Sequence, residues 1–266
     1  MTLIKVNTDK QLFNAVKNSA TNDIIELESD SYFTDSLATL PITHSLTITG
    51  RSPKAKSTIN ATFIIGSKPT NQTILILKNL SVDFTGDNIT TIALYDNSQL
   101  YCHNVIVSAN NDSKFDTIYC RDSAISLDNS VVLTNEYNSV GMSLENSQMT
   151  AVNSNFNTLG LKNSTVYLKD CLVNEYVGVL NKSSLSFSGL AIDSRSTENI
   201  SDLYVEDESD LRGNDLAFAA PNPSISITNS NFDNVNFLSD INKIDWFYDD
   251  NSEVLANGQE PRNSNI

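Results

Sequence analysis

Mostly charged side chains recur at one position in successive segments of the chain, and their types could support acid–base chemistry or anion binding. In chain order this position carries Asp96, Arg121, Glu145, Lys162, Asn181 and Asp207. A cation such as Arg121 between two carboxylates can act as a base or clamp an anionic ligand. The same alternation also forms a ladder of exposed ion pairs that only fixes strand register, each pair contributing about some tenths of a kcal/mol. The residues alone are compatible with both interpretations.

Tyrosines beside polar side chains form a second group that could bind a ligand. Tyr119 comes two residues before Arg121, and Tyr137 and Tyr176 each follow an Asn-Glu pair. An aromatic ring can stack on the apolar face of a sugar while amide and carboxylate groups bind its hydroxyls. The same residues also suit a solvent-exposed turn whose tyrosine packs on the neighbouring segment.

The cysteines and histidines predict no further chemistry. Cys102, Cys120 and Cys171 have no C-x-x-C spacing, and the first two fall at positions that we expect to be buried and inert. His44 and His103 lie far apart and lack a metal-ligand spacing. We therefore predict no metal ligands and no cofactor, while the acidic loops could hold a weakly bound calcium ion.

The charge balance excludes some partners. The net charge is −15 at pH 7, which opposes binding to nucleic acid and to anionic membranes. No apolar stretch reaches the roughly 18 residues that span a bilayer, so we predict no membrane insertion. The N-terminus lacks the apolar core of a signal peptide. We expect a secreted or cell-surface protein whose leader is absent from this sequence, with a cytoplasmic location as the alternative.

The strongest pattern in the sequence is a repeat with a polar or glycine anchor in each copy. Apolar residues stand four and two positions before each anchor, and mostly polar residues lie between them, as in a half-buried strand. Anchor spacings of about 17 to 25 residues are in the range of solenoid turns. We interpret residues 203–218, before Asn229, as one degenerate turn. Asparagine anchors of successive turns can stack and hydrogen-bond to one another, because adjacent strands lie about 4.8 Å apart. The anchors are Gly50, Asn79, Asn104, Asn129, Asn153, Asp170, Gly189 and Asn229.

Each turn is thus expected to contain three strands. The anchor strand ends at the anchor, the following strand comes after it, and the preceding strand comes before it, beyond a small polar turn. The preceding strands point Ile118 and Cys120, or Leu159 and Leu161, into the core. In two turns we assign the inward positions to Ala93 and Tyr95, and to Gly178 and Leu180.

With these repeats, the chain resembles the right-handed parallel β-helices of the pectin-lyase-like superfamily over roughly residues 1–235. The resemblance implies an all-β, single-stranded solenoid of about eight coils, with an amphipathic helix that caps its N-terminal end. Thr8 or Asp9 can cap that helix, and Leu12, Phe13 and Val16 share one of its faces. We expect one domain over residues 1–250, capped at its C-terminal end by residues 241–250, and a flexible polar tail over residues 251–266.

The resemblance also suggests what the charged row could do, because enzymes of this superfamily act on acidic polysaccharide in a groove over one strand row. A catalytic site would then use Arg121, Lys162, Glu145 and Asp96, and ligand contacts would come from Tyr119, Arg121, Tyr137 and Tyr176. The motifs of polygalacturonases and the convergent carboxylates of pectate lyases are not found in the sequence.

Our first hypothesis is therefore a non-catalytic, monomeric surface β-helix, acting as an adhesin or carbohydrate-binding module toward a polysaccharide or a host glycan or protein. The alternative is a polysaccharide lyase or a related enzyme that acts on acidic polysaccharide. A third hypothesis is a purely structural spacer. A groove with an unpaired basic side chain would favour the enzyme, and a closed ladder of ion pairs would argue against it.

Overall fold

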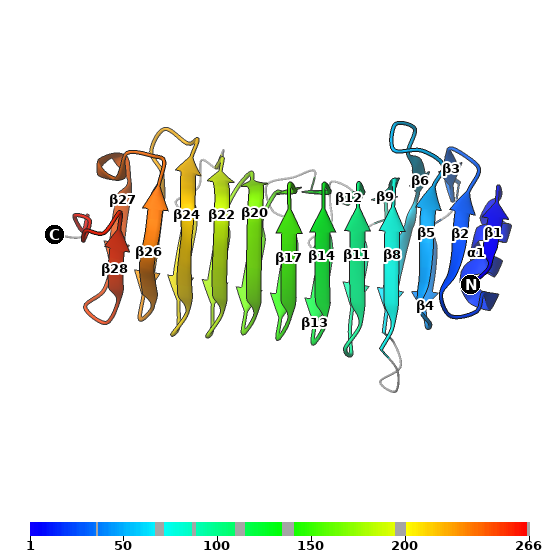
Figure 1. Cartoon of the computed structure of the whole chain (residues 1–266), viewed down its shortest axis with the longest axis horizontal. Coiled ribbons are helices and arrows are strands. Elements are labelled where there is room, and N and C mark those ends of the chain that lie inside the picture. The colour runs from blue at the N-terminus through cyan, green and yellow to red at the C-terminus, as the bar shows by residue number, and fades with distance from the viewer. Residues whose placement is uncertain are drawn as a thin grey trace. The chain divides into compact units, whose positions relative to one another are not determined.

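The computed structural model describes residues 1–35, 37–66, 72–86, 89–109, 115–134, 141–194 and 201–264. These divide into two compact units, Met1–Met142 and Ser143–Ile266. Within each unit, strands from successive turns lie side by side and pair in parallel (Figure 1). The chain is therefore an all-β parallel solenoid, which confirms the expected fold class.

The first unit repeats a pattern of three strands per turn. Its only described helix is α1 (Asp9–Asn18). The anchor strands are β1 (Leu3–Val6), β2 (Asp23–Leu27), β5 (Leu46–Gly50), β8 (Ile74–Lys78), β11 (Gln99–His103) and β14 (Ala124–Asp128). The following strands are β3 (Ser31–Tyr32), β6 (Ser57–Ile59), β9 (Leu80–Phe84), β12 (Ile106–Ala109) and β15 (Val131–Thr134). The preceding strands are β4 (Ala38–Ile42), β7 (Ala61–Ile65), β10 (Ile92–Leu94) and β13 (Ile118–Arg121).

In the second unit, the anchor and following strands merge after the first turn. The unit contains β17 (Gln148–Val152) and β18 (Asn155–Phe156), then the continuous strands β20 (Thr165–Val173), β22 (Ser184–Ile192), β24 (Asp210–Phe218), β26 (Asn231–Phe237) and finally β28 (Glu253–Ala256). The preceding strands are β16 (Met142–Glu145), which begins at the unit boundary, β19 (Leu159–Lys162), β21 (Val177–Leu180), β23 (Leu203–Glu206), β25 (Ser224–Thr228) and β27 (Asp245–Tyr248). A 3₁₀ turn, η1 (Ile241–Lys243), comes before β27.

The anchor strands have the predicted register. Leu75, Leu100 and Ile125 pair in sequence across β8, β11 and β14, and all three side chains are buried. The anchor Asn104 adopts a left-handed backbone with φ 54°, which asparagine tolerates better than most residues. Its Nδ2 donates to Oδ1 of Asn79 at 2.9 Å, so these two anchors form the expected asparagine ladder.

Two preceding strands have the opposite phase to our prediction. In β10 the core residues are Ile92 and Leu94, so Tyr95 points outward, and in β21 they are Val177 and Val179. The sequences Ile-Ala-Leu and Val-Gly-Val-Leu are apolar at every position, so alternation alone does not fix their phase. In both strands the bulkier, branched side chains fill the interior.

The bend between preceding and anchor strands contains a second ladder, which the sequence analysis missed. A left-handed Asp or Asn, such as Asn163 with φ 48°, is followed by a buried serine. The Oγ of Ser164 accepts the N–H of Ser147 at 3.0 Å and donates to the carbonyl of Lys162 at 2.8 Å. The N–H of Ser164 donates to Ser183 in the same way at 3.1 Å. Backbone groups buried at this bend are thereby paired.

The described residues wind about ten turns, because ten strands belong to the shorter sheet of preceding strands. Our estimate of about eight coils was low. Residues 203–218, which we interpreted as a degenerate turn, form the regular strands β23 and β24. Asn229 lies in the serine bend after β25, and so it is not an anchor.

Both ends of the chain carry packed elements. Thr8 is the N-cap of α1, and Leu12 and Val16 are buried as predicted, whereas Phe13 is 42% exposed. The segment after Asn251, where we expected a flexible tail, contains β28, which pairs with β26 and buries Val254. The apolar alternation of Glu-Val-Leu-Ala explains why this segment joins the solenoid.

The serine ladder predicts a specific loss of stability. Ser164→Ala removes the acceptor of a buried N–H, so the free energy of unfolding should fall by about 1 to 3 kcal/mol. Urea unfolding followed by circular dichroism measures this change. The matched control is Ser81→Ala in β9, because Ser81 is half-exposed and no side-chain hydrogen bond to a described residue is found for it. Equal stability of the two variants would contradict the proposed role of the ladder.

Candidate functional site

The predicted charged row does not form as expected around Arg121. Leu94 pairs with Cys120, so the residue aligned with Arg121 is Tyr95, while Asp96 lies in the bend with φ 55°. The Cζ of Arg121 lies 5.2 Å from the centroid of the Tyr95 ring, and its Nε lies 3.9 Å from Oδ2 of Asp122. Arg121 therefore stacks on a tyrosine that itself lies 5.9 Å from the Tyr119 ring. Asp96 does not flank Arg121 in the same row, because the phase of β10 is shifted by one residue.

Lys162 and Glu145 do form an ion pair. Nζ of Lys162 lies 3.4 Å from Oε1 of Glu145, and both side chains are partly exposed. A screened surface pair of this kind contributes little to stability. The other members of the predicted row, Asn181 and Asp207, lie in the serine bend with φ 52° and 59°. The geometry of this pair favours the structural interpretation of the charged row.

Tyr176 lies against a neighbouring tyrosine. The rings of Tyr176 and Tyr204 stack with centroids 5.8 Å apart and planes 29° apart, and the Tyr204 ring covers Gly178. Burial, followed by the nearby Tyr176 and Glu206, raises the pKa of Tyr204 to about 12. Burial also raises the pKa of Glu175. Tyr137, the second tyrosine in an Asn-Glu-Tyr context, lies outside the described residues.

The second unit has a surface that our sequence analysis did not single out. In β22 the side chains of Leu185 and Phe187 point into the core, so Ser184, Ser186 and Ser188 form the outward face. We call these three residues the serine floor. Because serine is short, this strand forms a shallow floor between the longer side chains of its two neighbours.

The side chains that flank the serine floor include an aromatic ring and two cations, and the remaining neighbours are Thr165, Asp210 and Asn214. Ser186 pairs with Tyr167 of β20 on one side and with Arg212 of β24 on the other. Lys169 of β20 pairs with Ser188. Tyr167 is 41% exposed, and Lys169 and Arg212 are exposed as well. Strands are spaced about 4.8 Å apart, so Tyr167 and Arg212 stand about two strand spacings from each other.

These two cations differ from others nearby in having no counter-ion among the residues that the structure describes. Lys162 pairs with Glu145, and Lys182 pairs with Glu208 at 3.1 Å. Neither Lys169 nor Arg212 makes an ion pair within the part of the chain that the structure describes. Their charges are therefore available to an anionic ligand lying on the serine floor.

Beside the serine floor lies a pocket of about 330 Å³. Arg212 lines it together with three carboxylates, and Nδ2 of Asn231 donates to Oδ1 of Asp210 at 2.8 Å. The lining residues are Ser184, Asp210, Leu211, Arg212, Asn231, Asp233, Asn234 and Glu253. A guanidinium and carboxylates in one pocket can bind both the charge and the hydroxyls of a polar ligand.

The described residues give little support for metal or thiol chemistry. In these ranges, no group of three or more His, Cys, Asp or Glu side chains is placed to hold a metal ion. Cys102 and Cys120 are buried as predicted, and burial raises the pKa of Cys102 to about 12. No helix in the described part of the chain is long and apolar enough to cross a bilayer.

The sequence carried a signal for the serine floor, because Ser-Leu-Ser-Phe-Ser is an anchor strand with serine at every outward position. The sequence pattern did not reveal that Arg212 lies beside this strand. We interpreted the residues around Arg212 as a degenerate turn, so Arg212 had no assigned place beside Ser186.

Comparison with known proteins adds distant likenesses. No family model and no curated protein matches the chain significantly. Among solved structures, the PL6 family alginate lyase AlyGC is similar at 15% identity and a TM-score of 0.46, covering 96% of this chain and 40% of that one. An alginate lyase from Paenibacillus sp. str. FPU-7 has 12% identity and a TM-score of 0.24, with 99% of both chains covered. The chain thus spans 40% of the length of the first of these structures.

The tyrosine pair makes a prediction about titration. A Cβ at position 178 would lie 2.6 Å from the Tyr204 ring, so Gly178→Ala should push this ring toward solvent. The pKa of Tyr204 should then fall from about 12 toward the ordinary tyrosine value of about 10. Ultraviolet titration of tyrosinate measures the change, and Tyr204→Phe assigns the signal.

The same shift has a consequence for stability. The folded state holds the Tyr204 proton more tightly than the unfolded chain does, so this contribution is complete below pH 10 and is lost as pH rises toward about 12. Gly178→Ala should weaken that pH dependence. An unchanged tyrosine titration in Gly178→Ala would show that the ring is not held by its packing over Gly178.

Proposed function

We propose that the chain binds an acidic polysaccharide along the serine floor. The observation that carries this proposal is the strand of outward serines between two cations that pair with no carboxylate of the described residues, in a chain whose net charge is −15. Lys169 and Arg212 would bind carboxylate or sulfate groups of the polymer. The exposed ring of Tyr167 would stack on the apolar face of a sugar, and the serine hydroxyls would bind its hydroxyls.

In this proposal the chain is a secreted or surface-located, monomeric carbohydrate-binding module, and adhesion is one use of such binding. A solenoid suits a polymer because each turn repeats the same outward spacing, so weak contacts add along its length. The ring of Tyr176, in the same unit as the serine floor, is a further proposed contact for a sugar. Tyr119 is a separate proposed contact within the first unit.

A second candidate function is a polysaccharide lyase, and the observation that favours it is the pair of cations Lys169 and Arg212, which make no ion pair with any described residue. In β-elimination, one cation holds the carboxylate of a uronate unit while a base removes the proton from the adjacent carbon. The electron pair forms the new C=C bond, and the glycosidic oxygen leaves and takes up a proton. Arg212 would hold the carboxylate. Lys169, in its neutral form, would accept the proton and then return it, directly or through water, to the leaving oxygen. The ion-paired Lys162 is less suited to either role.

The binding proposal predicts a specific loss of affinity. The double variant Lys169→Ala/Arg212→Ala should bind immobilised pectate or alginate about tenfold or more weakly, because charge-assisted contacts are each worth about 1.5 to 3 kcal/mol. Binding of the unmodified chain should also weaken as salt is added, since salt screens exposed charges. Affinity electrophoresis at several salt concentrations measures both effects.

The matched control is Lys10→Ala/Lys243→Ala, which removes two exposed cations elsewhere in the chain. Equal losses in the two double variants would mean that only net charge matters. No retention of the unmodified chain on any acidic polymer would reject the proposal.

The lyase candidate has its own assay. Incubation with pectate and with alginate should produce unsaturated ends that absorb in the ultraviolet, and Arg212→Ala should abolish this signal. Parallel reactions with added calcium and with a chelator test the expectation of a calcium ion. Retention on a polymer without any unsaturated product leaves the binding module and eliminates the lyase.

A further inference from the structure

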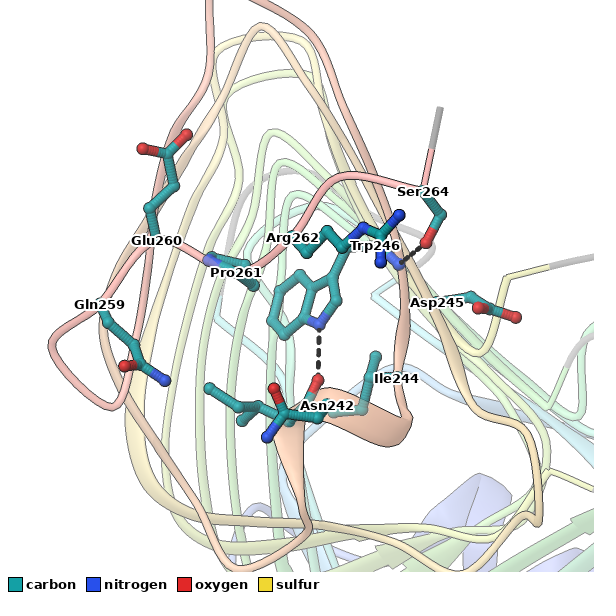
Figure 2. A pocket seen from close by; sticks show the side chains of 10 residues that line it. Asn242, Ile244, Asp245, Trp246, Gln259, Glu260, Pro261, Arg262 and Ser264 are labelled. Atoms are coloured by element: carbon teal, nitrogen blue, oxygen red, sulfur yellow. Dashed lines mark hydrogen bonds between the residues drawn. The ribbon is translucent and has the colours of Figure 1, made fainter. Parts of the chain in front are cut away.

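A pocket of about 690 Å³ lies at the C-terminal end of the second unit, away from the serine floor in sequence and lined by different residues. One wall is η1 and the start of β27, and the other is the segment Gln259–Ser264, which we call the strap. Figure 2 shows the indole of Trp246 between the strap and the η1 turn, with Pro261 and Arg262 on the strap side. A volume of this size is in the range of small-molecule sites.

Hydrogen bonds fix both walls of this pocket. The indole N–H of Trp246 donates to the carbonyl of Ile241 at 3.1 Å, and the backbone N–H of Trp246 donates to Oγ of Ser264 at 3.2 Å (Figure 2). The N–H of Ser264 donates back to the carbonyl of Trp246 at 2.7 Å. The hydroxyl of Tyr248 donates to the carbonyl of Pro261, also at 2.7 Å. The pocket is therefore preformed, which lowers the entropic cost of binding.

The lining combines apolar and polar groups in a way that suits one class of ligand. Ile241, Ile244, Trp246 and Pro261 are buried and supply apolar walls. Such walls accommodate the C–H groups of a ring and exclude water from part of it.

The polar lining carries both signs of charge. Arg262 is exposed and makes no ion pair with any residue in the described ranges, while Asp245 and Glu260 place two carboxylates in the same pocket. Gln259 and Asn242 add amides that both donate and accept. The two carboxylates repel a polyanion and so disfavour its binding, and Arg262 likewise disfavours the binding of a cation. A neutral ligand rich in hydroxyls can use the donors and the acceptors together.

We propose that this end pocket binds a neutral sugar of one or two rings. The site is separate from the serine floor, and the inference does not depend on the proposed function. The two surfaces would therefore differ in charge preference, with acidic polymer on the serine floor and uncharged sugar at the end of the solenoid.

The test uses the single tryptophan of the chain, because its indole N–H gives one NMR signal that reports from this pocket alone. The probes are maltose, cellobiose and lactose at millimolar concentration, with digalacturonate as the acidic counterpart. At least one neutral disaccharide should shift the indole signal in a saturable way, and digalacturonate should not.

Variants separate binding from general effects. Gln259→Ala/Arg262→Ala removes two exposed strap side chains and should weaken the response about tenfold or more, given two lost hydrogen-bonding groups, one of them charged. Lys243→Ala is the control, since Lys243 is exposed on η1 and does not line the pocket. Its response should equal that of the unmodified chain.

Three results would overturn the inference: no saturable shift with any neutral disaccharide, a stronger shift with digalacturonate, or an unchanged response in the strap variant. Because acidic polymers are assayed by retention and neutral sugars by the indole signal, a failure here leaves the serine-floor proposal intact, and the reverse also holds.

Discussion

The fold depends on one constraint with two parts. Every turn must return the backbone so that the same strand positions point into the core, and no polar group may be left unpaired at the bends. Asn and Asp solve the first part by adopting the left-handed conformation at a single residue, as at Asn104 and Asn163. Stacked side chains solve the second, through the hydrogen bond from the Asn104 amide to the Asn79 amide oxygen and through the serine ladder around Ser164. A turn that lacked these partners would bury a donor without an acceptor.

This constraint also explains how the outward surface is organised. Once the phase is fixed, each strand contributes one side chain to every outward row, at steps of about 4.8 Å. A binding surface is then a choice of outward residue types on neighbouring strands. On β22 every outward residue of the serine floor is serine, and the long side chains of Tyr167 and Arg212 stand on either side of Ser186. The ion pair of Lys162 with Glu145 shows a different choice, in which the charges of neighbouring strands neutralise each other.

The sequence predicts phase where polar and apolar residues alternate, and it fails where they do not. The anchor strands alternate clearly, so Leu100 and its equivalents were placed correctly, whereas β10 and β21 are apolar throughout and their phase is decided by packing. The place of Arg212 beside Ser186 required knowing that residues 210–218 form a regular strand. The end pocket could not be predicted, because the strap reaches Trp246 through a hydrogen bond with Ser264, and no local pattern in the sequence indicates that this segment folds back onto β27.

Because the net charge is −15, salt affects the binding of an acidic polymer to this chain in two ways. At long range the whole chain repels a polyanion, while at contact Lys169 and Arg212 attract it. The Debye length is about 10 Å at 0.1 M salt, so the long-range repulsion is already largely screened there and further salt acts mainly on the contact attraction. Dissociation should therefore become faster as salt is added, and binding should weaken. A localised pair of cations on an acidic surface thus confines binding to the serine floor and disfavours non-specific adsorption elsewhere.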